Sequence, residues 1–165
     1  MKFHLVDRIE SIVPGERIVT IKALSLAEEY LADHFPAFPV LPGVMMIEAM
    51  VQAAAWLVRV QQDFARSIVV LSAARNVKYA RFVQPGEVLR CELTAMEIGQ
   101  ESARFKGAGF VGDRQAVSGR LELRCFDLAG RTAGGAAADE AIRAQLRQWF
   151  KLVGGPEALA AAGVA

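Results

Sequence analysis

One long apolar stretch constrains the fold of this chain more than any other part of its sequence. Residues 44–58 read V-M-M-I-E-A-M-V-Q-A-A-A-W-L-V, in which only Glu48 and Gln52 are polar. A helix that is apolar on every face is normally buried, so the stretch predicts a central helix from Gly43 to about Phe64. Because an unpaired charge in the interior is costly, Glu48 needs either a partner or a chemical role.

Strand-like segments lie on both sides of this expected helix. Before it, residues 4–13 and 16–24 are joined by the turn signal Pro14-Gly15, and residues 25–33 indicate a short helical turn and a loop. After it come the strand-like segments 67–72, 77–83, 87–97, 102–111 and 115–127. This order predicts an α+β fold in which an antiparallel sheet wraps around one long central helix.

The composition changes near residue 128. We therefore expect a domain over residues 1–128, an Ala/Gly-rich linker over 129–138 and a helical extension over 139–165. Asp139 is a residue type that caps helices, and the helix after it should run to about Val153, with a short helix following. Its apolar residues share one stripe, so it should pack on its own domain or on a neighbouring subunit, as a packing element, a lid or a partner-binding element.

Charge, hydropathy and cysteine content argue against several classes of protein. A net charge of +1 gives no electrostatic case for nucleic-acid binding. The apolar stretch is shorter than a membrane span, and the N-terminus lacks a signal-peptide pattern, so we expect a cytoplasmic protein without membrane insertion. Cys91 and Cys125 are too few for a disulfide framework or a thiolate metal cluster, and both should be buried in strands.

A histidine stands shortly before the apolar stretch, in the segment D-H-F-P-A-F-P-V-L-P-G. The prolines recur every third residue, which predicts an extended, stiff polyproline II segment between His34 and the helix. Gly43 at the helix start offers free backbone N–H groups that favour negative charge. Together with Glu48, these groups suit proton abstraction beside a carbonyl and loss of a β-hydroxyl. Taken singly, His34 could be structural, and Gln52 could satisfy Glu48 one turn away.

The same residues carry a resemblance to a known family. The pattern H-F-P-x-x-P-V-x-P-G-V-x-x-x-E-A-M-x-Q over residues 34–52 resembles the motif of the β-hydroxyacyl-(acyl carrier protein) dehydratases of the hot-dog fold. Looser agreement on both flanks extends the resemblance to about residues 4–127. It implies a single hot-dog domain that forms homodimers by joining sheets, in some members trimers of dimers, with active sites shared between subunits.

The resemblance also implies a role for each residue of the motif. His34 would remove the α-proton of a β-hydroxyacyl thioester, Glu48 would protonate the departing hydroxyl, and the Gly43 N–H would polarise the thioester carbonyl. The Val40 carbonyl would orient the histidine, and Gln52 would hold the glutamate. An apolar acyl tunnel would be lined by Phe35, Phe38, Met45 and Met46. The substrate would be linked to acyl carrier protein or coenzyme A, in fatty-acid or related biosynthesis, and no metal or organic cofactor is implied.

Two places in this segment depart from the family pattern. Asp33 stands where the family commonly has glycine, and Ala37-Phe38 replaces a typical Gly-Arg, which would make the tunnel mouth more apolar.

The carrier partner is acidic, so basic residues should lie near the tunnel mouth. Lys78 and Arg81 are the candidates, together with Arg75, although a strand would not place all three on one face.

Two other functions stay open on the sequence alone. A hot-dog acyl thioesterase would use a carboxylate to direct water, but a hydrolase needs no base for an α-proton, and the H-F-P loop therefore argues against it. A non-catalytic acyl-binding or scaffolding subunit would not need both His34 and Glu48. The pattern does not indicate an acyl chain length or decide between a dimer and a hexamer.

Overall fold

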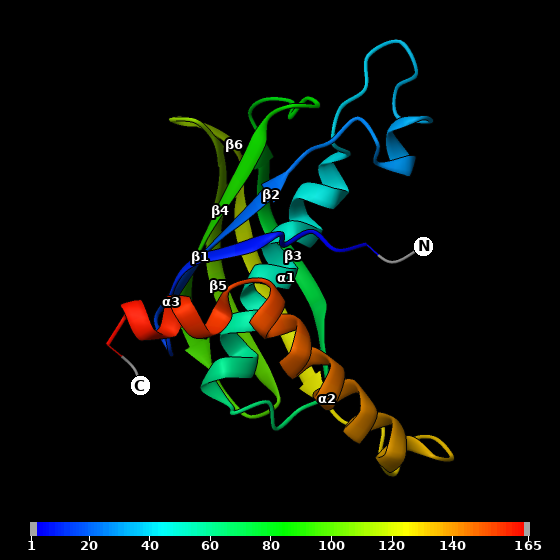
Figure 1. The fold of residues 1–165 in the computed structure, drawn as a ribbon, viewed down its shortest axis with the longest axis vertical. Helices are drawn as coiled ribbons and strands as arrows, with labels where there is room; N and C mark the ends of the chain where they lie inside the picture. The colour runs from blue at the N-terminus through cyan, green and yellow to red at the C-terminus, as the bar shows by residue number, and fades with distance from the viewer. Residues whose placement is uncertain (1–2, 164–165) are drawn as a thin grey trace.

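The computed structural model describes residues 3–163, and its centre is one curved antiparallel sheet (Figure 1). The sheet has the strand order β1-β2-β4-β5-β6-β3. The strands are β1 (Arg8–Val13), β2 (Arg17–Ala23), β3 (Ile68–Tyr79), β4 (Val88–Ile98), β5 (Ser102–Val111) and β6 (Arg114–Phe126). The helices are the 3₁₀ turn η1 (Glu29–Leu31), α1 (Gly43–Gln61), α2 (Gly135–Leu152) and α3 (Gly155–Ala161).

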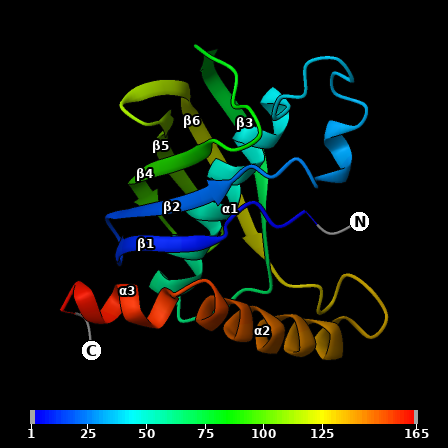
Figure 2. The same cartoon turned by 45° about the horizontal axis from the view of Figure 1, so that its top comes forward.

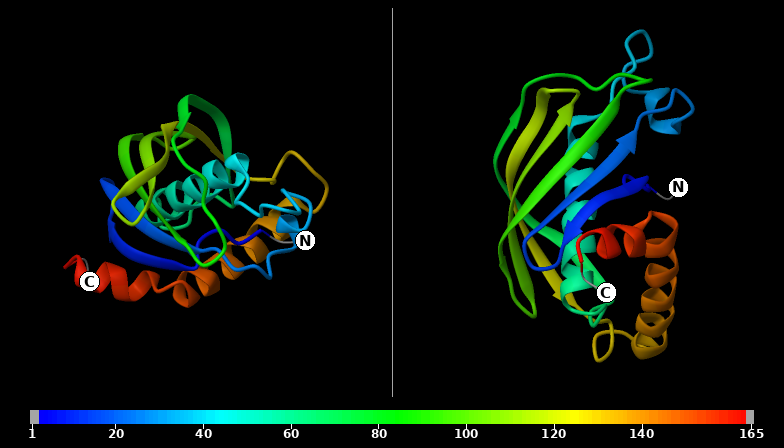
Figure 3. Two further views of the ribbon diagram at one scale, coloured as in Figure 1. Left: turned by 90° about the horizontal axis from the view of Figure 1, so that it is seen from above. Right: turned by 60° about the vertical axis from the view of Figure 1, so that its left-hand side comes forward.

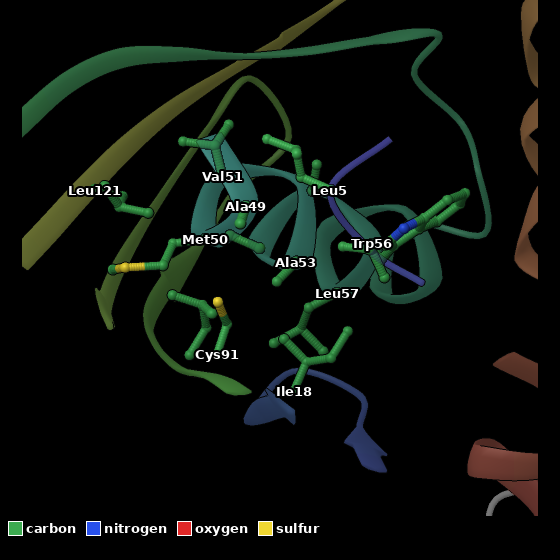
Figure 4. Close-up of a cluster of buried hydrophobic side chains, with 14 of the residues drawn as sticks. Leu5, Ile18, Ala49, Met50, Val51, Ala53, Trp56, Leu57, Cys91 and Leu121 are labelled. Atoms are coloured by element: carbon green, nitrogen blue, oxygen red, sulfur yellow. The ribbon is translucent and has the colours of Figure 1, made fainter. Parts of the chain in front are cut away.

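Helix α1 lies inside the curve of the sheet, as the views from above and from the side show (Figure 3). Its side chains Met50 and Leu57 are directed toward Ile18, Cys91 and Leu121 of the strands (Figure 4). By length and composition α1 could cross a membrane, but its apolar side chains form the core of this domain. The predicted α+β fold with one central helix is confirmed.

A glycine on β5 lets α1 approach the sheet closely. A Cβ atom at Gly107 would lie 2.3 Å from Leu93 Cδ1 and 2.7 Å from Met50 Cε. The helix ends at Gln61, slightly earlier than expected, because Phe64 N–H folds back to donate to the Arg59 carbonyl at 2.7 Å.

Both cysteines are buried, as the sequence predicts. Burial raises the pKa of the Cys91 thiol to about 12, so this side chain is a neutral thiol at physiological pH. The pKa of the Cys125 thiol is raised for the same reason. Both residues therefore serve as small apolar core side chains rather than as reactive groups.

Strand β3 corrects the end of one expected segment. The strand-like segments 67–72 and 77–83 belong to one continuous strand, which ends at Tyr79 rather than at residue 83. Its pairing with β6 shifts register between Leu71 and Ala73 and again between Arg75 and Lys78, where Asn76 has a φ of 53°. These irregularities absorb the intervening polar residues without ending the strand.

The segment before α1 corrects a second expectation. Phe38 N–H donates to the Phe35 carbonyl at 2.9 Å, which closes a tight turn, and Val40 N–H reaches the His34 carbonyl at 3.2 Å. The first part of the proline-rich segment is therefore folded back rather than extended as polyproline II. It forms a loop beyond the end of the sheet, opposite α2 (Figure 1).

The C-terminal part also differs from the sequence expectation. Helix α2 begins at Gly135, inside the expected linker, and its N-cap is Gly134 rather than Asp139. The Asp139 side chain is buried and accepts hydrogen bonds from the Ser67 hydroxyl, from Leu128 N–H at 2.9 Å and from Ala129 N–H at 2.8 Å. Asp139 therefore fastens α2 to the domain instead of capping it.

Both C-terminal helices pack on their own subunit, at one end of the sheet (Figure 2). The Phe150 ring lies against those of Trp56 and Phe64, with centroids 5.7 and 5.6 Å away. Ile9 N–H of edge strand β1 donates to the Val153 carbonyl at 2.7 Å. This end of the molecule thus covers part of the β1 edge, whereas the long outer edge of β3 has no partner strand among residues 3–163.

Candidate active site

His34 lies in the loop between η1 and α1, and its ring is held by the same loop. Its Nδ1 atom is 3.2 Å from the Val40 carbonyl oxygen, the contact that the family resemblance implies. A carbonyl accepts only, so Nδ1 carries a proton, and in the neutral imidazole the Nε2 lone pair is left to accept another. Leu41 N–H donates to the Val83 carbonyl at 2.9 Å, which anchors this loop to the segment after β3.

Glu48 and Gln52 lie one turn apart on α1. The Gln52 Nε2 group donates to Glu48 Oε1 at 2.9 Å. It also donates to the Phe3 carbonyl at 3.0 Å, while Gln52 Oε1 accepts from Leu5 N–H at 2.9 Å. These bonds fix the amide and aim one N–H at the glutamate. Glu48 itself is half-buried in this subunit rather than enclosed, which differs from the expectation drawn from its apolar neighbours.

The N-terminal segment is a part of this arrangement that sequence reasoning missed. It holds Gln52 through backbone atoms of Phe3 and Leu5. Contacts of backbone atoms cannot be recognised from the pattern of residue types. The only sequence signal was the looser family resemblance of this flank. A positioning role for this segment therefore became visible only in three dimensions.

Gly43 begins α1, and no protein group within residues 3–163 accepts a hydrogen bond from its N–H. A Cβ atom there would lie 3.0 Å from Cε1 of Tyr79, so a larger residue would displace that ring. Tyr79 was not among the residues expected at the site. A free N–H at the first turn of a helix is suited to binding a developing oxyanion.

A cavity of about 410 Å³ adjoins these residues. Its walls are mostly apolar and are formed by His34, Phe35, Leu41, Gly43, Met46, Tyr79, Ala80, Arg81 and Phe82. Of the expected tunnel residues, Phe35 and Met46 line it. Phe38 packs edge-on against the Phe82 ring at 5.7 Å, and Met45 is half-buried and does not line it.

One subunit does not gather all the expected catalytic groups around this cavity. His34 and Gly43 line it, but Glu48 does not. Glu48 comes five positions after Gly43, and such a step places two Cα–Cβ directions about 140° apart around a helix axis. The expected base and the expected oxyanion donor therefore lie on one side of α1, and the expected acid lies on another.

The expected carrier contacts are not equivalent. Arg75 is paired with Glu122 at 2.7 Å on the sheet surface, and Arg81 is paired with Glu87. Lys78 is exposed, and no acidic side chain of residues 3–163 pairs with it. Of these three residues, only Lys78 thus offers a charge that no acidic side chain of residues 3–163 compensates.

No three His, Cys, Asp or Glu side chains in the described part of the chain lie close enough to hold a metal ion. The chemistry available to the groups around the cavity is proton transfer and oxyanion binding.

Comparisons with known proteins extend these observations. The FabA-like domain family matches residues 1–120. A 3-hydroxyacyl-(acyl-carrier-protein) dehydratase FabZ from Clostridium kluyveri is 35% identical over 125 residues, covering 76% of this chain and 87% of the relative. Another FabZ, from Rhizorhabdus wittichii, is 38% identical over 125 residues, covering 74% of this chain and 80% of the relative.

Solved structures share the fold at lower identity. The dehydratase heterocomplex ApeI:P from Xenorhabdus doucetiae aligns with a TM-score of 0.60 at 20% identity, covering 74% of this chain and 82% of that one. The PaaI protein of E. coli aligns with a TM-score of 0.54 at 13% identity, covering 72% and 78%. Helices α2 and α3 lie beyond the family match, which ends at residue 120. The extent of that match and the identity to FabZ proteins show that this chain belongs to the β-hydroxyacyl-(acyl carrier protein) dehydratase family of the hot-dog fold.

Proposed function

We propose that this protein dehydrates β-hydroxyacyl thioesters, carried on acyl carrier protein, to trans-2-enoyl thioesters in fatty-acid or related acyl-chain biosynthesis. The observation that carries the proposal is the state of His34. Its Nδ1 proton is committed to the Val40 carbonyl, and its ring lines an apolar cavity together with Gly43. A base and an oxyanion donor thus border one space large enough for an acyl thioester.

The proposed reaction uses protein groups only. His34 Nε2 takes the α-proton, and the C–H electron pair moves toward the thioester carbonyl, whose oxygen is stabilised by the Gly43 N–H. Those electrons then form the α,β double bond as the β C–O bond breaks. Glu48 gives its proton to the departing oxygen, and water leaves. Returning the proton from His34 to Glu48 restores the starting state. A positioned acid or base typically contributes about 10²–10⁴-fold to the rate, and an oxyanion donor about 10²–10³-fold.

Glu48 comes to this cavity, we propose, from a second subunit. The outer edge of β3 has no partner among the described residues, and Val70 and Leu71 on it are 42% and 38% exposed. Antiparallel pairing of two β3 strands would continue the sheet and bring one α1 beside the loop of the other subunit. Such a homodimer would hold two active sites, each shared between the subunits, and we expect it in the cytoplasm. A measurement of its mass in solution distinguishes it from a trimer of these dimers.

The first experiment identifies the reaction. A β-hydroxybutyryl thioester is incubated with the protein, and both enoyl absorbance and free thiol are followed. We expect enoyl product without thiol release. Thiol release would instead identify a thioesterase, and the absence of both products would identify a non-catalytic acyl-binding subunit, so either result contradicts the proposal.

Carrier recognition gives a second prediction. Lys78→Glu should raise KM for a carrier-linked substrate several-fold while leaving kcat nearly unchanged, because Lys78 offers an unpaired charge to an acidic carrier. The effect should shrink at high salt, since exposed charges are screened. Arg81→Glu would also break the ion pair with Glu87, so its effect combines carrier recognition with the loss of that ion pair.

Arg124→Glu is the matched control, because Arg124 is also exposed but lies at the opposite end of the sheet, near the end of β6. It should leave KM unaltered. If Lys78→Glu and Arg124→Glu behave alike, the carrier does not dock beside the end of β3.

A further inference from the structure

A second cavity, of about 590 Å³, is separate from the first but borders Gln52, which holds Glu48. It is enclosed by α2, by α1 and by the N-terminal segment, which lie close together in Figures 1 and 2. Neither His34 nor Gly43 lines it. One of its walls is α2, which lies beyond the part of the chain that matches the family.

The walls of this cavity combine a broad apolar surface with one fixed charge. Leu146, Trp149 and Leu152 of α2 form one side, and Trp56 of α1 forms part of the other. Leu152 is 80% exposed, so apolar surface continues to the mouth of the cavity. Among residues 3–163, Arg59 is the only Lys, Arg, Asp or Glu side chain that lines the cavity. Of those residues, a ligand there would meet one cation and no competing carboxylate.

Arg59 is half-buried, and it lacks the acidic partner that a guanidinium in such a position normally has. Its Nε atom is buried without a hydrogen-bond partner among residues 3–163, and no acidic side chain of those residues pairs with it. Its guanidinium carbon lies 5.3 Å from the centroid of the Trp56 ring. Burial lowers the pKa of Arg59 to about 10, so the side chain is still cationic at neutral pH. A buried cation without a counter-ion is costly, and an anionic ligand would remove that cost.

We propose that this cavity binds a medium-chain carboxylate, with its head group on Arg59 and its alkyl chain against Leu146, Trp149 and Leu152. The guanidinium fork matches a carboxylate in geometry and charge. The volume falls within the range of small-molecule sites, which are commonly apolar with a few placed polar groups. The amide of Gln145 also lines the cavity and adds hydrogen-bonding groups near the cation, whereas the amide of Gln52 is already bonded to Glu48, Phe3 and Leu5.

The chain carries its own reporter for this site. It has two tryptophans, Trp56 and Trp149, and both line the cavity. Titration of the full-length protein with decanoate should therefore give a saturable change in tryptophan fluorescence. Decanol has the same chain without the charge and should bind about 10–100-fold more weakly, which is the effect of losing one charge-assisted hydrogen bond.

Variants test the role of the charge. Arg59→Met should weaken decanoate binding by about 10–100-fold, whereas Arg120→Met, which removes an exposed arginine on β6, should not. Gln145→Glu places a carboxylate in the wall at an exposed position and should also weaken decanoate binding, even if Arg59→Met fails to fold. Equal affinity for decanoate and decanol, or unchanged binding in both wall variants, would overturn the proposal. His34→Ala should bind decanoate normally, so this result stands apart from that of the dehydratase assay.

Discussion

His34→Ala is expected to lower kcat on a β-hydroxyacyl thioester by about 10²–10⁴-fold, the typical contribution of a positioned general base. The ring is half-buried and its one hydrogen bond is to the Val40 carbonyl, so its removal should leave the melting temperature nearly unchanged. The rate is measured from enoyl absorbance. Glu140→Ala is the control, because it removes an exposed titratable side chain on α2, away from the loop that holds His34. It should retain nearly full activity.

Glu48→Gln should cause a loss of similar size for a different reason. A glutamine side chain can still accept the hydrogen bond from Gln52 Nε2, so the local geometry is kept while the transferable proton is lost. If His34→Ala or Glu48→Gln retained native kcat, the proposed proton transfers would be wrong.

Mixing the two inactive variants tests whether the site is shared. If the base and the acid come from different subunits, each mixed dimer of His34→Ala and Glu48→Gln contains one intact site. Random exchange at equal amounts should then restore about a quarter of the native activity. Lack of any recovery after subunit exchange, verified by mass, would mean that both groups act within one subunit.

The central helix could be predicted from the sequence because a helix that is buried on all sides is apolar at almost every position. Residues 44–58 contain no continuous polar face, which requires that other parts of the fold surround them, and the strand-like segments on both sides indicate a sheet. The hydrogen bonds of His34 with Val40 and of Gln52 with Glu48 could likewise be anticipated, because the motif fixes both spacings. Their catalytic roles stay predictions that the variants above test.

Other features depend on contacts between distant residues and could not be predicted. Tyr79 reaches Gly43 only because β3 continues past its register shifts to the start of α1. The half-burial of Glu48 reflects the shape of a single subunit, whereas the apolar neighbours in its sequence suggested full enclosure. The folded-back loop after His34 follows from backbone hydrogen bonds that override the proline repeat.

The role of Asp139 in the C-terminal part could not be predicted from the sequence either. Its residue type commonly caps helices, but here its side chain binds groups that are distant in the sequence. Three donors meet its carboxylate, and they come from Ser67, before β3, and from Leu128 and Ala129, after β6. The residue is only 1% exposed. It thus joins α2 to the start of β3 and to the end of β6, and losing it leaves all three donors without their acceptor.

Asp139→Ala is therefore expected to destabilise the C-terminal part, lowering the melting temperature by about 3–10 °C. Burial raises the pKa of Asp139, but hydrogen bonds from the Ser67 hydroxyl and the two backbone N–H groups lower it by more. The net pKa therefore lies below its ordinary value. A carboxyl with a depressed pKa in the folded state stabilises the protein above its unfolded pKa of about 3.9, and this contribution disappears as the pH falls through the folded value.

The pH dependence separates the charge from the shape of this side chain. Asp139→Asn keeps the size and one acceptor oxygen, so it should be more stable than Asp139→Ala but should lack the acid-dependent part of the native stability. Glu140→Ala, at an exposed neighbouring position on α2, should change neither property. Thermal unfolding of the native protein and the three variants between pH 7 and pH 3 measures both effects. Equal melting temperatures for Asp139→Ala and Glu140→Ala would show that this carboxylate does not hold α2 against the domain.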